Sequence, residues 1–203
     1  MTAGPTLEDV QAAGFPMGGE PLVALDLADT LMTAVDPAVD LIEPTDGYET
    51  WWRLQLPRLP EASVPAAAAT RRLRAAIRDL LESHLETRAP QAVSIEDLNA
   101  FASAVPRSPR LALDAEGALT ATTRWHTEHG GNAALAAIAT EAIDLLSSPA
   151  QLEKLRRCAN PACSMLFVAE TKRRQWCTGN ICGNRARVAR HYRRTHAPSP
   201  SPS

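Results

Sequence analysis

The four cysteines of this 203-residue chain lie in one short segment near its C-terminal end. They form two C-x4-C pairs, separated by thirteen residues, at Cys158, Cys163, Cys177 and Cys182. Two close thiol pairs joined by a short loop are the donor set of a tetrahedral zinc site, because each pair spans one edge of the tetrahedron. The sequence therefore predicts one structural Zn2+ ion bound by all four cysteines, with no coordination position left for a substrate.

The sequence alone leaves other uses of these cysteines open. Two disulfides could form, although the N-terminus shows no secretory signal and we expect a cytoplasmic protein with reduced thiols. A redox-active dithiol is a further alternative. His191 and His196 have an H-x4-H spacing and could complete a Cys2His2 site, which would leave two thiols unused. We favour zinc bound by four thiolates.

A basic segment surrounds and follows the second cysteine pair. We expect a helix from Gly183 to Thr195, on which Arg187, Arg190 and Arg194 share one face at i, i+3 and i+7. Such a helix can enter the major groove of DNA or lie along phosphates. The candidate nucleic-acid-binding residues are Lys172, Arg173, Arg174, Arg187, Arg190, Arg193 and Arg194.

The positive charge is concentrated at this end of the chain. Residues 150–203 hold eleven lysines and arginines and two glutamates, whereas residues 1–149 hold ten basic and twenty-one acidic residues. The contrast favours a nucleic-acid partner, although the basic surface could instead be solvated or dock on the acidic part of the same chain. The sequence has no run of eighteen apolar residues, so we expect no membrane span.

Few helices or strands are predicted in the first sixty-five residues. Residues 1–19 are predicted to form a loosely held arm with one helical turn. The apolar run 21–31 is predicted to form a buried strand that leads into a helix. We expect Asp26, inside that run, to be hydrogen-bonded for structural reasons. Residues 36–65 contain five prolines and are predicted to be irregular, with Trp51 and Trp52 as the first place to look for a small-molecule pocket.

The remainder of the N-terminal part is mainly helical in pattern. We expect a helix over 65–87 with four arginines on its outside, a helix capped by Ser94 and Asp97, a β-hairpin over 111–123 with Gly117 in its turn, and a helix from Asn132 to Ser147. A further helix over 150–157, with a serine cap at Ser148, should run directly into Cys158 and hold the metal site rigidly against the preceding residues.

Around the metal we expect a knuckle, a hairpin and the final helix, an order typical of treble-clef zinc modules. The hairpin strands are predicted near Met165–Val168 and Arg174–Trp176. Leu166 and Phe167 should join Trp176 in a small apolar cluster beneath the site. Gly183 should permit a tight turn, Asn184 should hydrogen-bond backbone around the thiolates, and Arg185 should satisfy buried carbonyls.

These residues resemble a known family, the CGNR zinc finger proteins. The tetrapeptide Cys182-Gly183-Asn184-Arg185 follows Trp176-Cys177 and a first knuckle, Cys158-Ala-Asn-Pro-Ala-Cys163. The run Leu25-Asp26-Leu27-Ala28-Asp29-Thr30-Leu31 is similar to the ABATE domain that accompanies this finger, with Asp29 where the family often has asparagine. The resemblance implies a bacterial protein whose relatives are regarded as transcription regulators.

Together these observations predict an α+β protein with an ABATE-like domain at 1–149, a zinc finger at 150–196 and a disordered tail at 197–203. The predicted function is zinc-dependent binding of double-stranded DNA by a transcription regulator, with a homodimer or a small-molecule effector served by the N-terminal domain. The alternative is a zinc-stabilised module that binds RNA or protein. The sequence shows no Gly-rich phosphate loop and no nucleophile elbow, so we expect no enzyme.

Overall fold

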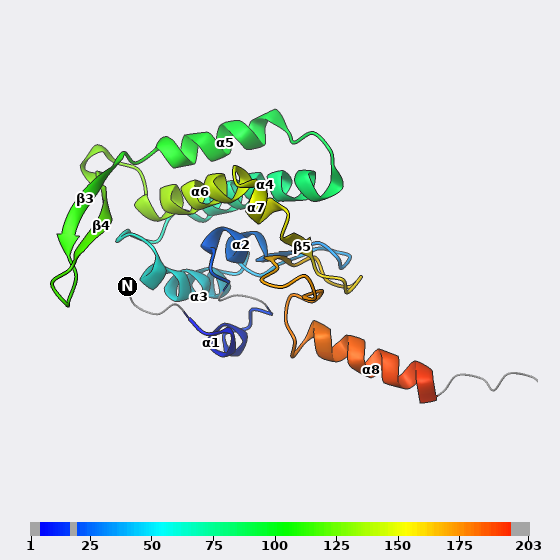
Figure 1. Cartoon of the computed structure of the whole chain (residues 1–203). Helices are drawn as coiled ribbons and strands as arrows, with labels where there is room; N and C mark the ends of the chain where they lie inside the picture. The colour runs from blue at the N-terminus through cyan, green and yellow to red at the C-terminus, as the bar shows by residue number, and fades with distance from the viewer. Residues whose placement is uncertain (1–4, 17–19, 196–203) are drawn as a thin grey trace, which may run out of the picture.

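The computed structural model describes residues 5–16 and 20–195 and has the predicted α+β architecture (Figure 1). The predicted tail, residues 197–203, lies outside the described residues. The helices are α1 (Leu7–Ala12), α2 (Val23–Ala28), α3 (Thr45–Gln55), η1 (Leu56–Arg58), α4 (Ala67–Glu86), α5 (Ala92–Ser103), η2 (Thr127–His129), α6 (Ala133–Leu146), α7 (Pro149–Leu152) and α8 (Cys182–Thr195). Three antiparallel strand pairs are β1 (Leu31–Met32) with β2 (Val39–Asp40), β3 (Arg107–Leu113) with β4 (Leu119–Trp125), and β5 (Leu155–Arg157) with β6 (Leu166–Val168).

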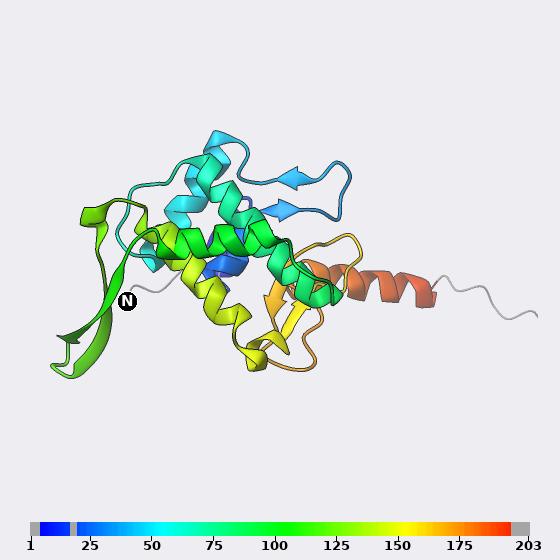
Figure 2. The ribbon, with the colours of Figure 1, turned by 90° about the horizontal axis from the view of Figure 1, so that it is seen from above.

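The main core lies where α2, α4 and α6 meet, and α5 packs on α4 and α6 (Figures 1 and 2). α4 has the predicted helical stripe, with Leu73, Ile77 and Leu81 fully buried. α6 begins as predicted, because the Asn132 side chain accepts a hydrogen bond from the Leu135 N–H at 3.1 Å. All six residues of α2 are buried, so this short helix forms the centre of the N-terminal part. Within the described residues, no helix is both long and apolar enough to cross a membrane.

The order of elements in residues 21–31 was predicted wrongly. The chain forms helix α2 first and only then the short strand β1, rather than a strand followed by a helix. Because this apolar run is buried on every side, its pattern shows no period that separates a helix from a strand. A backbone N–H at the start of α2 finds its hydrogen-bond acceptor far away in the sequence, since Glu141 on α6 accepts from the Ala24 N–H at 2.7 Å.

Trp51 and Trp52 lie on helix α3, not in a loop, and they form no pocket wall. Their exposed fractions are 2% and 0%, and their rings pack edge to face with centroids 5.0 Å apart. Tyr48 and Gln55 complete a buried face at i, i+3, i+4 and i+7. The residues of this segment do have a helical period, but the prolines on either side of it favoured the prediction of an irregular segment.

Two arginines of α4 that were expected outside are buried. Arg74 binds the Asp40 carboxylate on β2 through both Nη atoms, at 2.6 and 2.5 Å. Arg78 donates to the carbonyls of Ala28 and Leu31, each at 3.0 Å. A guanidinium can be buried when its donors meet carboxylates and carbonyls in this way. α4 thereby fixes the connection that follows α2.

The predicted capping box at Ser94 is absent, because α5 begins at Ala92 with Gln91 as its N-cap. Asp97 instead accepts from the Arg72 Nε at 2.8 Å and so joins α5 to α4. The predicted hairpin is present and longer than expected, as β3 and β4, with Gly117 at a φ of +82° in its turn. In both views this hairpin extends from the end of the molecule opposite α8 (Figures 1 and 2).

The predicted helix over 150–157 is wrong. α7 ends at Leu152, its N-cap Ser148 makes no side-chain hydrogen bond, and residues 155–157 form strand β5. β5 pairs with β6, so the strand at 166–168 has a partner that precedes the first cysteine rather than the predicted partner at 174–176. Leu155 and Leu166 both belong to the main core, which places this strand pair against the N-terminal part.

Candidate metal centre and nucleic-acid interface

The four cysteines meet at one point of the structure. Their sulfur atoms all lie within 4.8 Å of one another, and those of Cys163 and Cys177 are 3.8 Å apart. A tetrahedral zinc ion with Zn–S bonds of about 2.3 Å separates its sulfur ligands by about 3.8 Å. All four are free thiols, three of them buried, so the disulfide alternative is not what the chain forms. His196, the second residue of the alternative Cys2His2 set, lies outside the described residues.

The protonation of these thiols also fits a bound cation. Hydrogen bonds from Cys163 and Cys177 lower the pKa of Cys158 to about 2. The same contact with Cys158 raises the pKa of Cys163 to about 12, and the pKa of Cys177 is raised as well. One thiolate is therefore stabilised by its neighbours' protons, while further negative charge is opposed by the charge already there. A divalent ion removes this conflict, and the donor set is that of one structural zinc ion.

The first cysteine pair is held by the turn between β5 and β6. The Cys158 N–H donates to the Met165 carbonyl and the Cys163 N–H to the Asn160 carbonyl, each at 2.9 Å. The Asn160 side-chain amide points at the Cys182 sulfur from 3.4 Å. Asn160 thus has the position that sequence reasoning gave to Asn184, whose side chain is exposed. An asparagine inside the C-x4-C knuckle was the signal that could have found it.

The apolar cluster beneath the metal differs from the prediction in one member. Phe167 and Met165 are buried against the cysteines with Trp176 packed beside them, whereas Leu166 faces the main core. Gly183 does not make the predicted tight turn, because α8 already begins at Cys182. Gly183 instead packs in the first turn of α8, where a Cβ atom would lie 3.5 Å from the Trp176 ring. Arg185 is exposed and makes no side-chain hydrogen bond within the described chain.

A buried polar junction, which sequence reasoning did not find, joins the metal site to the N-terminal part. The fully buried Asp29 carboxylate accepts from the Leu166 N–H through both oxygens, at 2.9 and 3.1 Å, and burial raises its pKa well above the ordinary value. Arg78 donates to the Ser164 carbonyl at 3.1 Å, and the Ser164 hydroxyl accepts from the Thr33 N–H at 2.8 Å. The metal site is therefore fixed to α4 and to the residues that follow α2, although not through the helix over 150–157 that was expected to hold it.

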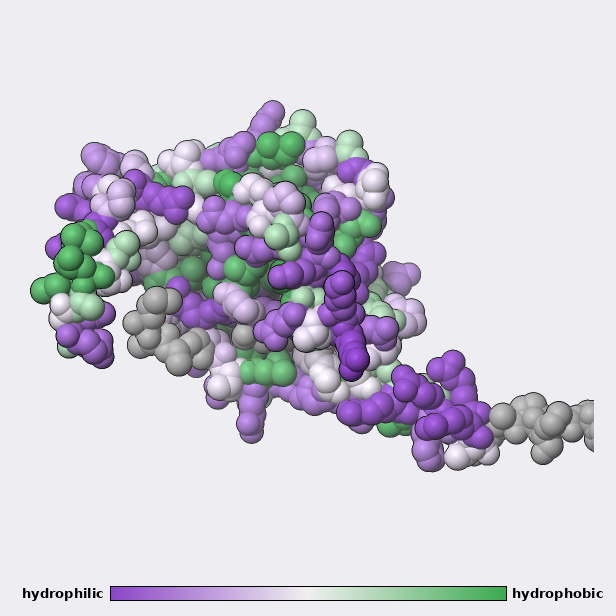
Figure 3. Space-filling model, viewed as in Figure 1, coloured by the Kyte–Doolittle hydropathy of each residue, from purple (hydrophilic) through white to green (hydrophobic). Residues whose placement is uncertain are grey.

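Helix α8 extends away from this junction (Figures 1 and 2). Arg187, Arg190 and Arg194 are all exposed on it, and its surface is strongly hydrophilic (Figure 3). In the described part of the chain, no carboxylate lies within ion-pair distance of any α8 arginine. The alternative that the basic helix docks on the acidic part of the same chain therefore does not hold for these residues.

Arg174 differs from the other basic candidates. Its Nη2 atom binds the Glu20 carboxylate at 2.6 Å and the Cys177 carbonyl at 2.7 Å, and its guanidinium lies 4.4 Å from the centre of the Phe167 ring. Arg174 is thus part of the structural junction and is not free for phosphate. Its neighbours Lys172 and Arg173 are exposed. Nothing in the run Lys172-Arg173-Arg174 distinguishes the residue that turns inward.

Comparison with protein families assigns both parts of the chain. Residues 22–149 match the ABATE family, described as "Putative stress-induced transcription regulator", and residues 154–195 match the CGNR zinc finger. Neither is an enzyme family. A search of curated proteins gives no match. The first match covers more than half of the chain, and the second contains all four clustered cysteines. The chain therefore belongs to the ABATE family, and its C-terminal part is a CGNR zinc finger.

Proposed function

We propose that this protein is a zinc-dependent, DNA-binding transcription regulator whose helix α8 contacts double-stranded DNA. The observation that carries the proposal is the exposed face of Arg187, Arg190 and Arg194, which has no intramolecular carboxylate partner among the described residues. Fourteen helical residues span about 21 Å, and a B-DNA major groove about 12 Å wide admits an α-helix. Arg193, Lys172 and Arg173 are exposed nearby and extend the phosphate-binding surface.

Zinc has an orienting role in this proposal. Cys182 is the first residue of α8, so a metal bound there fixes the direction in which the helix leaves the molecule. The junction at Asp29, Ser164 and Leu166 then fixes the metal site to the N-terminal part. A change in the N-terminal part can reach α8 through these contacts.

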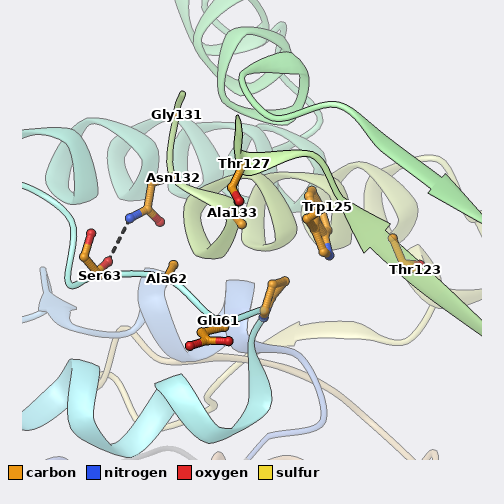
Figure 4. Close-up of a pocket in the computed structure, with 10 residues that line it drawn as sticks. Glu61, Ala62, Ser63, Thr123, Trp125, Thr127, Gly131, Asn132 and Ala133 are labelled. Atoms are coloured by element: carbon orange, nitrogen blue, oxygen red, sulfur yellow. Dashed lines mark hydrogen bonds between the residues drawn. The ribbon is translucent and has the colours of Figure 1, made fainter. Parts of the chain in front are cut away.

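We assign residues 150–196 to the DNA-binding finger and residues 1–149 to a domain that senses a ligand or dimerises, in a cytoplasmic protein. A cavity of about 620 Å³ at the base of the β3–β4 hairpin supports a small-molecule effector (Figure 4). Trp125 and Glu61 border it, and the Asn132 amide donates to the Ser63 carbonyl at 2.8 Å across one wall. This cavity replaces the pocket expected beside Trp51 and Trp52.

The test is capture of genomic DNA fragments by the zinc-loaded protein at physiological salt. The wild-type chain should enrich discrete sequences, and the triple variant Arg187→Ala/Arg190→Ala/Arg194→Ala should not. Loss of three phosphate contacts should make the slope of log K against log salt concentration shallower by about 2.7 on nonspecific duplex. The matched control, Arg53→Ala/Lys154→Ala/Arg156→Ala, removes three exposed positive charges outside α8 and should bind like wild type.

Zinc content and circular dichroism of the triple variant should equal those of the wild type, because these arginines support no buried contact. Binding that survives with an unchanged salt slope would remove α8 from the interface. Uniform or absent enrichment by the wild type would favour an RNA or protein partner. The exposed Val188 and Tyr192 on another face of α8, at 60% and 62%, favour protein in that case.

A further inference from the structure

The β3–β4 hairpin carries an apolar face that the chain itself leaves uncovered. Leu111, Leu113 and Leu119 are exposed at 67%, 67% and 70%. Leu113 is the cross-strand partner of Leu119, and Leu111 is the partner of Ala121, so all four side chains lie on one face of the hairpin. In the space-filling view they form an apolar patch at the edge of the molecule (Figure 3).

An apolar hairpin face of this kind is expected to be covered by a second layer of protein structure. A two-stranded hairpin is marginally stable in water by itself, and an apolar sheet face is normally packed against another element. Here β3 and β4 contact mainly each other, and the outer half of the hairpin stands clear of the helices (Figures 1 and 2). Exposed leucines gathered on a projecting element are typical of a protein–protein contact.

The charges at the two ends of the hairpin identify the partner. The turn at the tip carries the exposed Glu116, and the base carries the exposed Arg107 on the same face as the leucines. In the described part of the chain neither side chain forms an ion pair, and the Arg107 guanidinium lies 5.9 Å from the centre of the Trp125 ring. Leu111 lies four residues from Arg107 and five from Glu116, so it is close to the middle between the opposite charges. A surface with this pattern is complementary to itself when turned by a two-fold rotation.

We propose that the protein forms a homodimer in which two β3–β4 hairpins pack face to face and antiparallel around a two-fold axis near Leu111. The leucines of both copies make the centre of the contact, and Glu116 of each copy meets Arg107 of the other. Pairing along the edge of β3 is disfavoured, because Pro109 lacks the N–H that a ladder needs. The contact is small, so the dimer dissociates in about the micromolar range.

This inference deepens the dimerising role proposed for residues 1–149, and it is independent of DNA binding. Since the hairpin and α8 lie at opposite ends of the molecule, the two α8 helices lie at the outer ends of the dimer (Figure 1). A regulator of this shape reads two well-separated half-sites rather than adjacent ones.

The test is analytical ultracentrifugation of the full zinc-loaded chain without DNA, from about 5 to 200 µM, which brackets micromolar association. The wild-type mass should rise from one copy to two over this range. Leu111→Thr/Leu113→Thr/Leu119→Thr keeps β propensity and should stay monomeric, with Kd raised at least about tenfold. Val64→Thr/Val93→Thr/Ile95→Thr, which alters three exposed apolar residues elsewhere, should dimerise like wild type.

Charge reversal tests the arrangement separately and does not depend on the triple variant. Glu116→Arg and Arg107→Glu should each weaken the dimer about tenfold, because the two-fold axis repeats every pair, and the double variant should recover. A wild type that stays monomeric, or a leucine variant that dimerises normally, overturns the proposal. A double variant without recovery overturns the antiparallel arrangement. Loss of DNA binding alone leaves all these outcomes unchanged.

Discussion

The zinc finger has two sides that differ in almost every physical respect. On the side of β6, Leu166 and Phe167 are fully buried, and the backbone is hydrogen-bonded to the carboxylate of Asp29, directly after α2. On the side of α8, only Cys182 and Gly183 are buried. One metal site lies between the two. We call the side of β6 the inner side and the side of α8 the outer side. The inner side is therefore held in place by buried contacts, whereas the outer side exposes its surface to solvent.

The charged groups show the same contrast. Arginines on the inner side are paired or bonded, as Arg174 is with Glu20 at 2.6 Å and Arg78 with Glu82 at 2.9 Å. Those of α8 have only local contacts, such as Arg187 with the Gly179 carbonyl at 3.3 Å. A buried charge that loses its partner is strongly destabilising, whereas an exposed charge can be removed at little cost to stability. The difference separates residues that hold the fold from residues available to a partner.

Removing the metal should have the largest effect, because both sides of the zinc finger depend on it. Cys177→Ser or a strong chelator should abolish zinc binding, which contributes on the order of 10–16 kcal/mol of apparent free energy in small zinc modules. Since β6 also belongs to the main core, the melting temperature of the whole chain should fall. Elemental analysis and thermal unfolding with and without chelator measure both effects. Complete zinc release with an unchanged melting temperature would show that the inner side folds without the metal.

Cutting the junction should affect the inner side alone. Asp29→Ala leaves the buried Leu166 N–H without an acceptor, which should lower the free energy of unfolding by about 1–3 kcal/mol. Asp29→Asn keeps one acceptor oxygen and should cost less. Denaturant unfolding at neutral pH measures both, and zinc content should remain that of the wild type. Equal losses in the two variants would mean that the charge beside Arg78, rather than the hydrogen bond, stabilises the junction.

Local patterns predicted the elements whose signals lie within a few residues of one another. The C-x4-C pairs gave the metal site, the apolar stripe of Leu73, Ile77 and Leu81 gave α4, and Asn132 gave the start of α6. The helix expected from Gly183 to Thr195 agrees with α8 to within one residue at its start. In each case the residues that fix the structure are neighbours in sequence, so one segment contains the whole signal.

What the sequence did not predict depends on partners far apart in the chain. Asp29 binds a backbone N–H 137 residues away, and Arg78 meets Ser164 at a separation of 86. The burial of Arg78 cannot be inferred from nearby residues, because a charged side chain in an amphipathic helix is normally exposed. Asp29 lies in an apolar run, but nothing near it in the sequence identifies its partner. The strand β5 was missed for a related reason: its partner β6 lies across the first cysteine pair, and Ser148-Pro149 looked like the start of a long helix.

The last expected effect depends on pH and comes from Glu141 on α6, whose carboxylate lies at the start of α2. Burial raises the pKa of Glu141 from its ordinary value to about 7, although its carboxylate accepts from the Ala24 N–H. A raised pKa in the folded state means that the stability linked to this proton is present at acid pH and is lost as pH rises through about 7.

Glu141→Gln keeps an acceptor for the Ala24 N–H and cannot ionise. The free energy of unfolding of this variant should therefore rise relative to that of the wild type between about pH 5 and 8, by up to about 2.5 kcal/mol for a pKa near 7. Comparing the two chains at each pH removes the contribution of Asp26, whose pKa burial also raises, to about 6. Glu153→Gln, at an exposed glutamate, should show no such trend. DNA affinity should be equal in both chains at pH 7, because α8 lies outside this core. A pH-dependent loss of DNA binding in the wild type that is absent from Glu141→Gln would instead show that the core of the N-terminal part transmits its protonation state to α8.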